Sequence, residues 1–80
     1  MTEKTITVKE AMDARAAAYF VQTASKFTSK IQVTIENRRI NAKSIMGTIS
    51  LGIMEGQMAT ISAEGSDEEE AVNELASVLA

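Results

Sequence analysis

The chain has 80 residues, enough for one domain with one core, and a net charge of −3. It contains no cysteine and no histidine, which excludes disulfides, thiolate or imidazole metal sites and most pairs of nucleophile and base. Its aromatic residues are one tyrosine and two phenylalanines, whereas a nucleic-acid surface is usually basic with interleaved aromatic side chains. We therefore expect one domain over residues 1–80 that is cytoplasmic and lies off the membrane. We also expect that it does not bind nucleic acid directly, needs no cofactor and is not an enzyme.

The N-terminal part of the chain predicts a strand followed by a helix. Thr5–Val8 alternates polar and apolar side chains, the period of a half-buried strand. Between Ala14 and Phe27 the apolar residues recur at spacings of three and four, which places them on one helix face. The members of that face are Ala17, Phe20, Val21, Ala24 and Phe27. Asp13 precedes this helix, where its carboxylate can accept a backbone N–H from around Arg15 or Ala16 as an N-cap.

The next segment predicts a hairpin. Lys30–Glu36 carries three β-branched apolar residues at every second position, which is typical of a strand. Asn37 permits a turn, and Arg38–Asn41 returns as a partner strand. We interpret the adjacent arginines of this segment as turn chemistry.

A short helix and a third strand follow the hairpin. Ser44 is a suitable N-cap before an apolar stretch, and the helix is expected to end near Gly52. Gly56 marks a turn. Ala59–Ala63 alternates apolar and polar residues and predicts a strand.

The C-terminal segment predicts a last helix. Ser66–Glu69 has the sequence of a capping box, in which Ser66 accepts the N–H of Glu69 and Glu69 reaches back. Val72, Leu75 and the pair Val78/Leu79 form the buried stripe. The acidic run from Asp67 to Glu70 lies in the first turn, where the helix dipole favours negative charge, so we interpret it as a solvated helix start. The element order predicts an α+β fold with helices on one face of an antiparallel sheet.

Three stretches carry a resemblance to a known family. Ala14-Arg15 with Phe20–Phe27 resembles the first helix of HPr, the small phosphocarrier of the bacterial sugar phosphotransferase system. Asn41–Gly52 is similar to the regulatory-serine segment of Gram-positive HPr proteins, and Gly65–Glu68 is similar to the start of the family's last helix. The resemblance covers nearly the whole chain. It implies an open-faced β-sandwich, βαββαβα, in which three helices cover one face of four antiparallel strands.

The resemblance also marks a departure at the start of the first helix. The family has a histidine there, which accepts phosphate from enzyme I and passes it to transporter subunits. Asp13 stands at the matching position, and Ala16 replaces a proline. A carboxylate lacks the imidazole nitrogen of that relay, so the chain is most similar to the catabolite-repression HPr homologue, which likewise lacks the histidine. Asp13 is then a helix cap or, alternatively, the acceptor of an acyl phosphate.

The same comparison assigns roles to the regulatory segment. In Gram-positive relatives the serine matching Ser44 is phosphorylated by HPr kinase/phosphorylase, and the product is a corepressor of catabolite control protein A, a transcription factor. The resemblance implies phosphorylation of Ser44, with Lys43 as recognition or charge support and Arg15 as the family arginine that meets phosphate and partners. The alternative for Arg15 is a solvated first-turn arginine.

An apolar patch beside Ser44 completes the candidate site. Ile45, Met46 and Ile49 would lie exposed on the short helix as a partner-binding surface. The alternative is that Ser44 only caps the helix and that these three residues are core.

The sequence thus predicts a regulatory HPr-like protein. Its expected partners are HPr kinase/phosphorylase and a catabolite-control transcription factor, with enzyme I and transporter subunits as further candidates, and it is expected to be a monomer or a weak homodimer. Two alternatives stay open. One is an unphosphorylated interaction module that competes with HPr for its partners, and the other is a phosphocarrier that uses Asp13.

Overall fold

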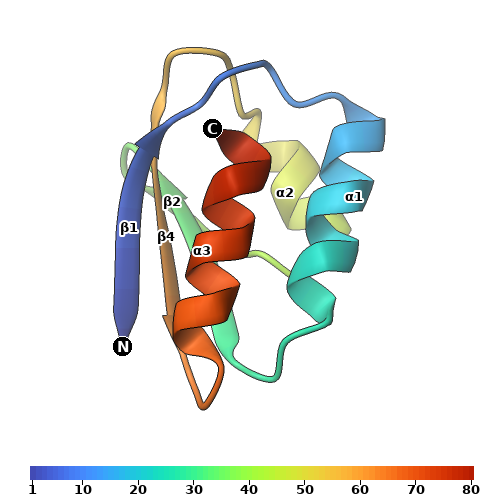
Figure 1. Cartoon of the computed structure of the whole chain (residues 1–80). Coiled ribbons are helices and arrows are strands. Elements are labelled where there is room, and N and C mark those ends of the chain that lie inside the picture. The colour runs from blue at the N-terminus through green and yellow to red at the C-terminus, as the bar shows by residue number, and fades with distance from the viewer.

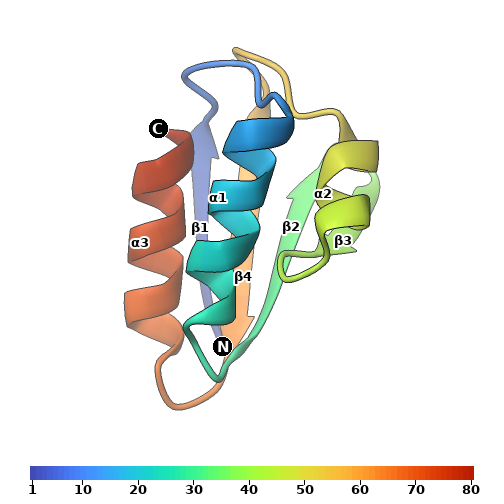
Figure 2. The same ribbon diagram turned by 90° about the vertical axis from the view of Figure 1, so that its right-hand side faces the viewer.

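The computed structural model describes all residues from 1 to 80 and contains four strands and three helices. In chain order these are β1 (Thr2–Thr7), α1 (Ala14–Ser25), β2 (Lys30–Ile35), β3 (Arg38–Asn41), α2 (Ile45–Leu51), β4 (Met58–Glu64) and α3 (Glu68–Leu79). The strands form one antiparallel sheet in the order β1-β4-β2-β3. All three helices cover the same face of this sheet (Figures 1 and 2). The predicted α+β sandwich is therefore confirmed.

The core lies between the two central strands and the helices. The inward residues of β2 and β4 pair across the strands, as Val33 does with Ile61, and the helix faces predicted from sequence pack over them, except that Val21 lies outside the core. Buried members from the sheet are Ile31, Val33, Ile35, Ala59, Ile61 and Ala63; those from the helices include Ala17, Phe20, Ala24, Val72, Leu75 and Leu79. Since side chains alternate across a strand, the other sheet face carries mainly polar residues, together with the exposed Met58 of β4. None of the three helices combines the length and the apolar character that a membrane-spanning helix needs.

Several element ends differ from the sequence prediction. β1 begins at Thr2, earlier than the apolar alternation indicates, because its first residues pair with β4. α1 ends at Ser25, so Phe27 lies outside the helix, where it is half-buried against the core. Thr23 is buried on the same helix face; its hydroxyl donates to the carbonyl of Tyr19, which satisfies a polar group that the apolar pattern does not reveal.

The predicted capping box at the start of α3 is wrong. Asp67 occupies the N-cap position but makes no side-chain capping bond, because its carboxylate accepts the N–H groups of Thr28 (2.9 Å) and Ser29 (3.0 Å) and the Ser29 hydroxyl. The Ser29 hydroxyl, followed by the Thr28 N–H, holds the pKa of Asp67 below its usual value. Asp67 therefore ties the α1–β2 loop to α3.

Glu68 links the start of α3 to the N-terminal strand. One carboxylate oxygen accepts the N–H of Gly65 (3.1 Å), and the other accepts the Thr2 hydroxyl (2.5 Å) and lies 3.2 Å from the Met1 amine. The hydrogen bond from Thr2 is the main reason why the pKa of Glu68 is lowered. Asp67 and Glu68 thus fasten the start of α3 to the α1–β2 loop and to the N-terminal strand, respectively.

Candidate functional site

Ser44 lies at the N-cap of α2, as the sequence predicts. Its hydroxyl oxygen accepts the N–H of Gly47 at 3.1 Å, and its carbonyl accepts both the N–H and the hydroxyl of Thr48. Gly52 ends the helix in a left-handed conformation with φ of 65°. These hydrogen bonds fix the Ser44 backbone at the start of α2. Because Ser44 is only half-buried, part of its side chain faces solvent.

Gly47 leaves room around the Ser44 hydroxyl. A Cβ built on Gly47 would lie 3.2 Å from Ser44 Oγ, closer than most such contacts, and 3.5 Å from the Cβ of Ile40, an ordinary van der Waals distance. The space over the hydroxyl thus depends on the absence of a side chain one helical turn later.

Three large apolar side chains of α2 face solvent beside Ser44. Their exposed fractions are 39% for Ile45, 74% for Met46 and 48% for Ile49, whereas Thr48 and Leu51 of the same helix are buried. The alternative that these three residues are core is therefore wrong. We call them the α2 patch.

Lys43 reaches away from the α2 patch. Its ammonium group donates to the carbonyl of Phe27 at 2.6 Å, and its backbone N–H donates to the side-chain carbonyl of Asn41. The lysine therefore fastens the segment before α2 to the loop after α1, which is a structural role the sequence did not reveal.

Asp13 caps α1, as predicted. One carboxylate oxygen accepts the N–H of Ala16 at 2.8 Å. Arg15 follows in the first turn with an exposed side chain. The N–H of Met12 bonds the carbonyl of Ile53, which places this end of α1 beside the C-terminal end of α2 (Figure 2). Ser44 begins the opposite end of α2, so the structure does not bring Arg15 and Ser44 together.

The interpretation of the arginine pair as turn chemistry is wrong. Both arginines lie in β3. The residue that adopts the positive φ of the preceding turn is Glu36, with φ of 56°. The Arg38 guanidinium donates to the carbonyls of Leu51 (2.6 Å) and Ser50 (3.4 Å), the free carbonyls at the end of α2. The positive charge of Arg38 thereby stabilises the negative C-terminal end of the α2 dipole. This contact is not predictable from local sequence, because Arg38 lies in the strand before the helix.

Comparison with known proteins identifies the family of this chain. The family described as "PTS HPr component phosphorylation site" matches residues 2–80. The chain belongs to the HPr family. The HPr-like protein Crh of Halalkalibacterium halodurans is 47% identical over an alignment of 77 residues, which covers 94% of this chain and 92% of that protein.

Solved HPr-family structures share the fold of this HPr-family chain. The HPr of Thermoanaerobacter tengcongensis is 52% identical, with a TM-score of 0.92 that covers 99% of this chain and 91% of that chain. The catabolite-repression protein Crh of Bacillus subtilis is 41% identical, with a TM-score of 0.78 over 91% of this chain and 82% of that chain, and is described as a swapped dimer. The 80 residues of this HPr-family chain include no histidine, so no phosphohistidine can form within them.

Proposed function

We propose that this HPr-family chain is a regulatory protein of carbon catabolite repression, and that phosphate on Ser44 is its signal. The observation that carries the proposal is the Ser44 hydroxyl at the N-cap of α2, next to the exposed α2 patch, in 80 residues without histidine. Its similarity to two proteins named Crh supports a role in catabolite repression.

The proposed modification is a kinase reaction on the Ser44 hydroxyl. HPr kinase/phosphorylase transfers the γ-phosphoryl group of ATP: the Oγ–P bond forms, the bond to ADP breaks, and the hydroxyl proton leaves. The product gains close to two negative charges. Gly47 supports this proposal, because a residue with a Cβ would crowd Ser44 Oγ.

The α2 patch and the phosphate have separate tasks in the proposed complex with a catabolite-control transcription factor. Burial of Ile45, Met46 and Ile49 supplies affinity, since each side chain has apolar surface to remove from water. The phosphate makes that affinity dependent on modification. Arg15, at the far end of α2, contributes only if the partner spans both helix ends.

Intact-mass spectrometry after incubation with HPr kinase/phosphorylase and ATP tests the modification. We expect one phosphate on the unsubstituted chain, none on Ser44→Ala, and one on Ser50→Ala, a control that removes an exposed hydroxyl from the same helix. Absence of a mass increase on the unsubstituted chain would contradict the proposal.

A second candidate, an unphosphorylated interaction module, is favoured by the exposure of Met46 itself. In that case Met46→Asp abolishes partner binding while Ser44→Ala leaves it unchanged. Met58→Asp is the matched control, because Met58 is 59% exposed but lies on β4. If phosphate is the signal, both Met46→Asp and Ser44→Ala weaken binding of the kinase-treated protein to the transcription factor.

The swapped dimer of Bacillus subtilis Crh supports a weak homodimer for this chain as well. Sedimentation over a range of protein concentrations tests this, and a constant monomer mass would contradict it.

A further inference from the structure

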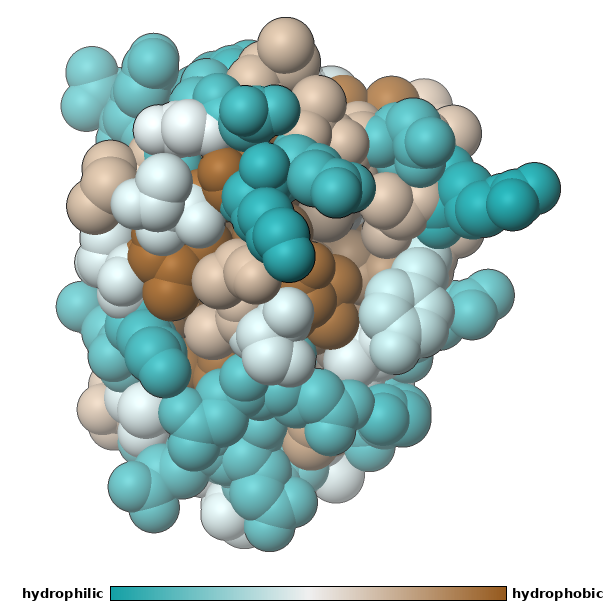
Figure 3. Space-filling model, turned by 45° about the horizontal axis from the view of Figure 1, so that its top comes forward, coloured by the Kyte–Doolittle hydropathy of each residue, from teal (hydrophilic) through white to brown (hydrophobic).

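A cavity of about 460 Å³ lies away from Ser44, between the β1–α1 loop, α1 and the end of α3. Figure 3 shows apolar surface in this hollow, with polar groups around it. Its volume falls in the range of roughly 300–1,000 Å³ that small-molecule sites have. The α2 patch and the Ser44 hydroxyl do not line it.

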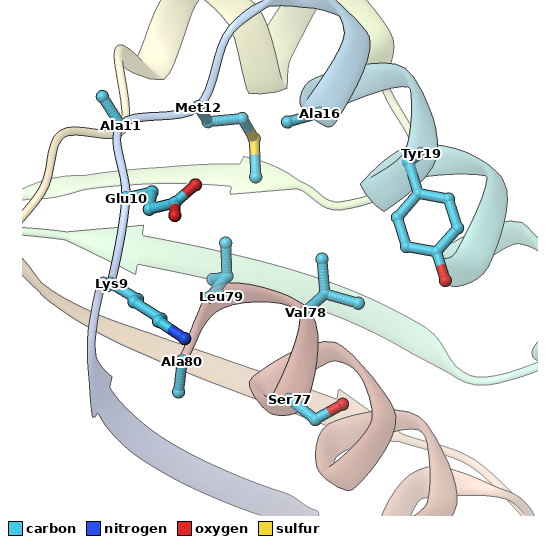
Figure 4. A pocket seen from close by; sticks show the side chains of 10 residues that line it. All are labelled: Lys9, Glu10, Ala11, Met12, Ala16, Tyr19, Ser77, Val78, Leu79 and Ala80. Carbon is cyan, nitrogen blue, oxygen red and sulfur yellow. The ribbon is translucent and has the colours of Figure 1, made fainter.

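The cavity has one charged end and one apolar end. Lys9 and Glu10 lie side by side on the β1–α1 loop, whereas Met12, Val78 and Tyr19 border the rest of the space (Figure 4). The Glu10 carboxylate points into the space in that view. The two ion pairs of the structure are Met1–Glu68 and Lys26–Glu74, so neither Lys9 nor Glu10 is held by an opposite charge.

Backbone hydrogen bonds fix the loop that carries Lys9 and Glu10, whose side chains are exposed. The N–H of Lys9 donates to the carbonyl of Leu79 at 2.8 Å, which fastens the loop to α3. The N–H of Val8 and the N–H of Met12 donate to the carbonyls of Gln57 (2.8 Å) and Ile53 (2.9 Å) on the other side of the loop. The backbone that carries both charges is therefore ordered before any ligand arrives, so binding orders only the two side chains and costs less entropy.

From this arrangement we infer that the cavity binds a free apolar α-amino acid as its zwitterion. Glu10 accepts the ammonium group, Lys9 donates to the carboxylate, and the aliphatic side chain lies against Met12, Val78 and Tyr19. The ligand has a cationic, an anionic and an apolar group, and the cavity offers an anionic, a cationic and an apolar wall to receive them. This inference is independent of phosphorylation at Ser44.

Titration of the ¹⁵N-labelled chain with L-leucine, followed by NMR, tests the inference. Saturable shifts are expected at the amides of Lys9, Glu10 and Val78 with millimolar leucine. L-leucinamide lacks the carboxylate and N-acetyl-L-leucine lacks the ammonium group, so each is expected to bind about tenfold more weakly, the effect of losing one hydrogen bond to a charged group.

Charge-removing variants assign the two contacts. Glu10→Gln is expected to weaken leucine and leucinamide about tenfold and to leave N-acetyl-leucine unchanged, whereas Lys9→Gln weakens leucine and N-acetyl-leucine and leaves leucinamide unchanged. Glu3→Gln and Lys4→Gln remove the same charges from exposed positions of β1 and are expected to change nothing. The inference is overturned if leucine gives no saturable shift, if the three ligands bind alike, or if the Lys9 and Glu10 variants bind leucine as the unsubstituted chain does.

Discussion

Gly65→Ala is expected to be among the most damaging single substitutions in this chain. Gly65 follows β4 with φ of 155°, and a Cβ built on it lies 2.5 Å from Ser29 Oγ and 2.7 Å from Ser29 Cα. A backbone atom cannot rotate away as a flexible side chain can. Ser29 is itself buried, and both its N–H and its hydroxyl donate to Asp67. The methyl group therefore has to displace the α1–β2 loop from α3.

The magnitude follows from two costs. Holding alanine at this φ costs about 1–3 kcal/mol. Moving Ser29 breaks at least one hydrogen bond to a carboxylate, which costs a further 1.5–3 kcal/mol or so. The expected loss of about 2.5–6 kcal/mol compares with a total unfolding free energy of roughly 4–12 kcal/mol for a domain of this length.

Urea unfolding followed by circular dichroism measures this loss, with Gly52→Ala as the control. Gly52 also has positive φ (65°), but no atom lies within 4 Å of a Cβ built there, so only the left-handed backbone cost of about 1–2 kcal/mol applies. If Gly65→Ala lowers the free energy of unfolding no more than Gly52→Ala does, the contact with Ser29 is not as described.

Substitutions at three further positions test the site and the charged contacts. Gly47→Ala should slow phosphorylation of Ser44 in a timed mass-spectrometric assay, because the new Cβ crowds Ser44 Oγ, while α2 stays formed since alanine favours a helix by about 1 kcal/mol over glycine; an unchanged rate would show that the crowding is unimportant. Asp13→Ala should lower the unfolding free energy by about 1 kcal/mol through loss of the α1 cap, and Asp13→Asn should lower it much less; equal losses would remove the capping role. Acidification should destabilise the fold, because the folded-state pKa values of Asp67 and Glu68 lie below their ordinary values of 3.8 and 4.5. The stability that these two groups contribute is complete above those ordinary values and is lost as the pH falls through the lowered ones. Asp67→Asn should therefore flatten the fall measured by urea unfolding at stepwise lower pH, and an unchanged slope would contradict the role of Asp67.

Local patterns predicted the parts of this fold that depend on neighbouring residues. The period-two strand at Lys30, the N-caps Asp13 and Ser44 and the left-handed Gly52 all act within a few residues, and each lies where the sequence placed it. The failures involve contacts between distant segments. Asp67 reads as part of a capping box, but its carboxylate bonds to a loop 38 residues earlier in the chain.

The candidate site shows the same division. The exposure of Ile45, Met46 and Ile49 follows from the helical spacing around buried Leu51, and the sequence anticipated it. The contact of Lys43 with Phe27 and that of Arg38 with the end of α2 depend on how α1, β3 and α2 meet, which no local pattern specifies. The cavity beside α3 also requires three separate segments.

The strand order has a consequence for the newly made chain. β1 leaves the ribosome before the other three strands, yet its only partner in the sheet is β4, which begins at Met58. At roughly 5–20 residues per second, β1 waits several seconds for that partner, while β2 and β3 can already form their hairpin. The open-faced sheet can therefore grow from the β2–β3 edge, with β4 added to β2 and β1 added to β4 last, although β1 is made before the other strands.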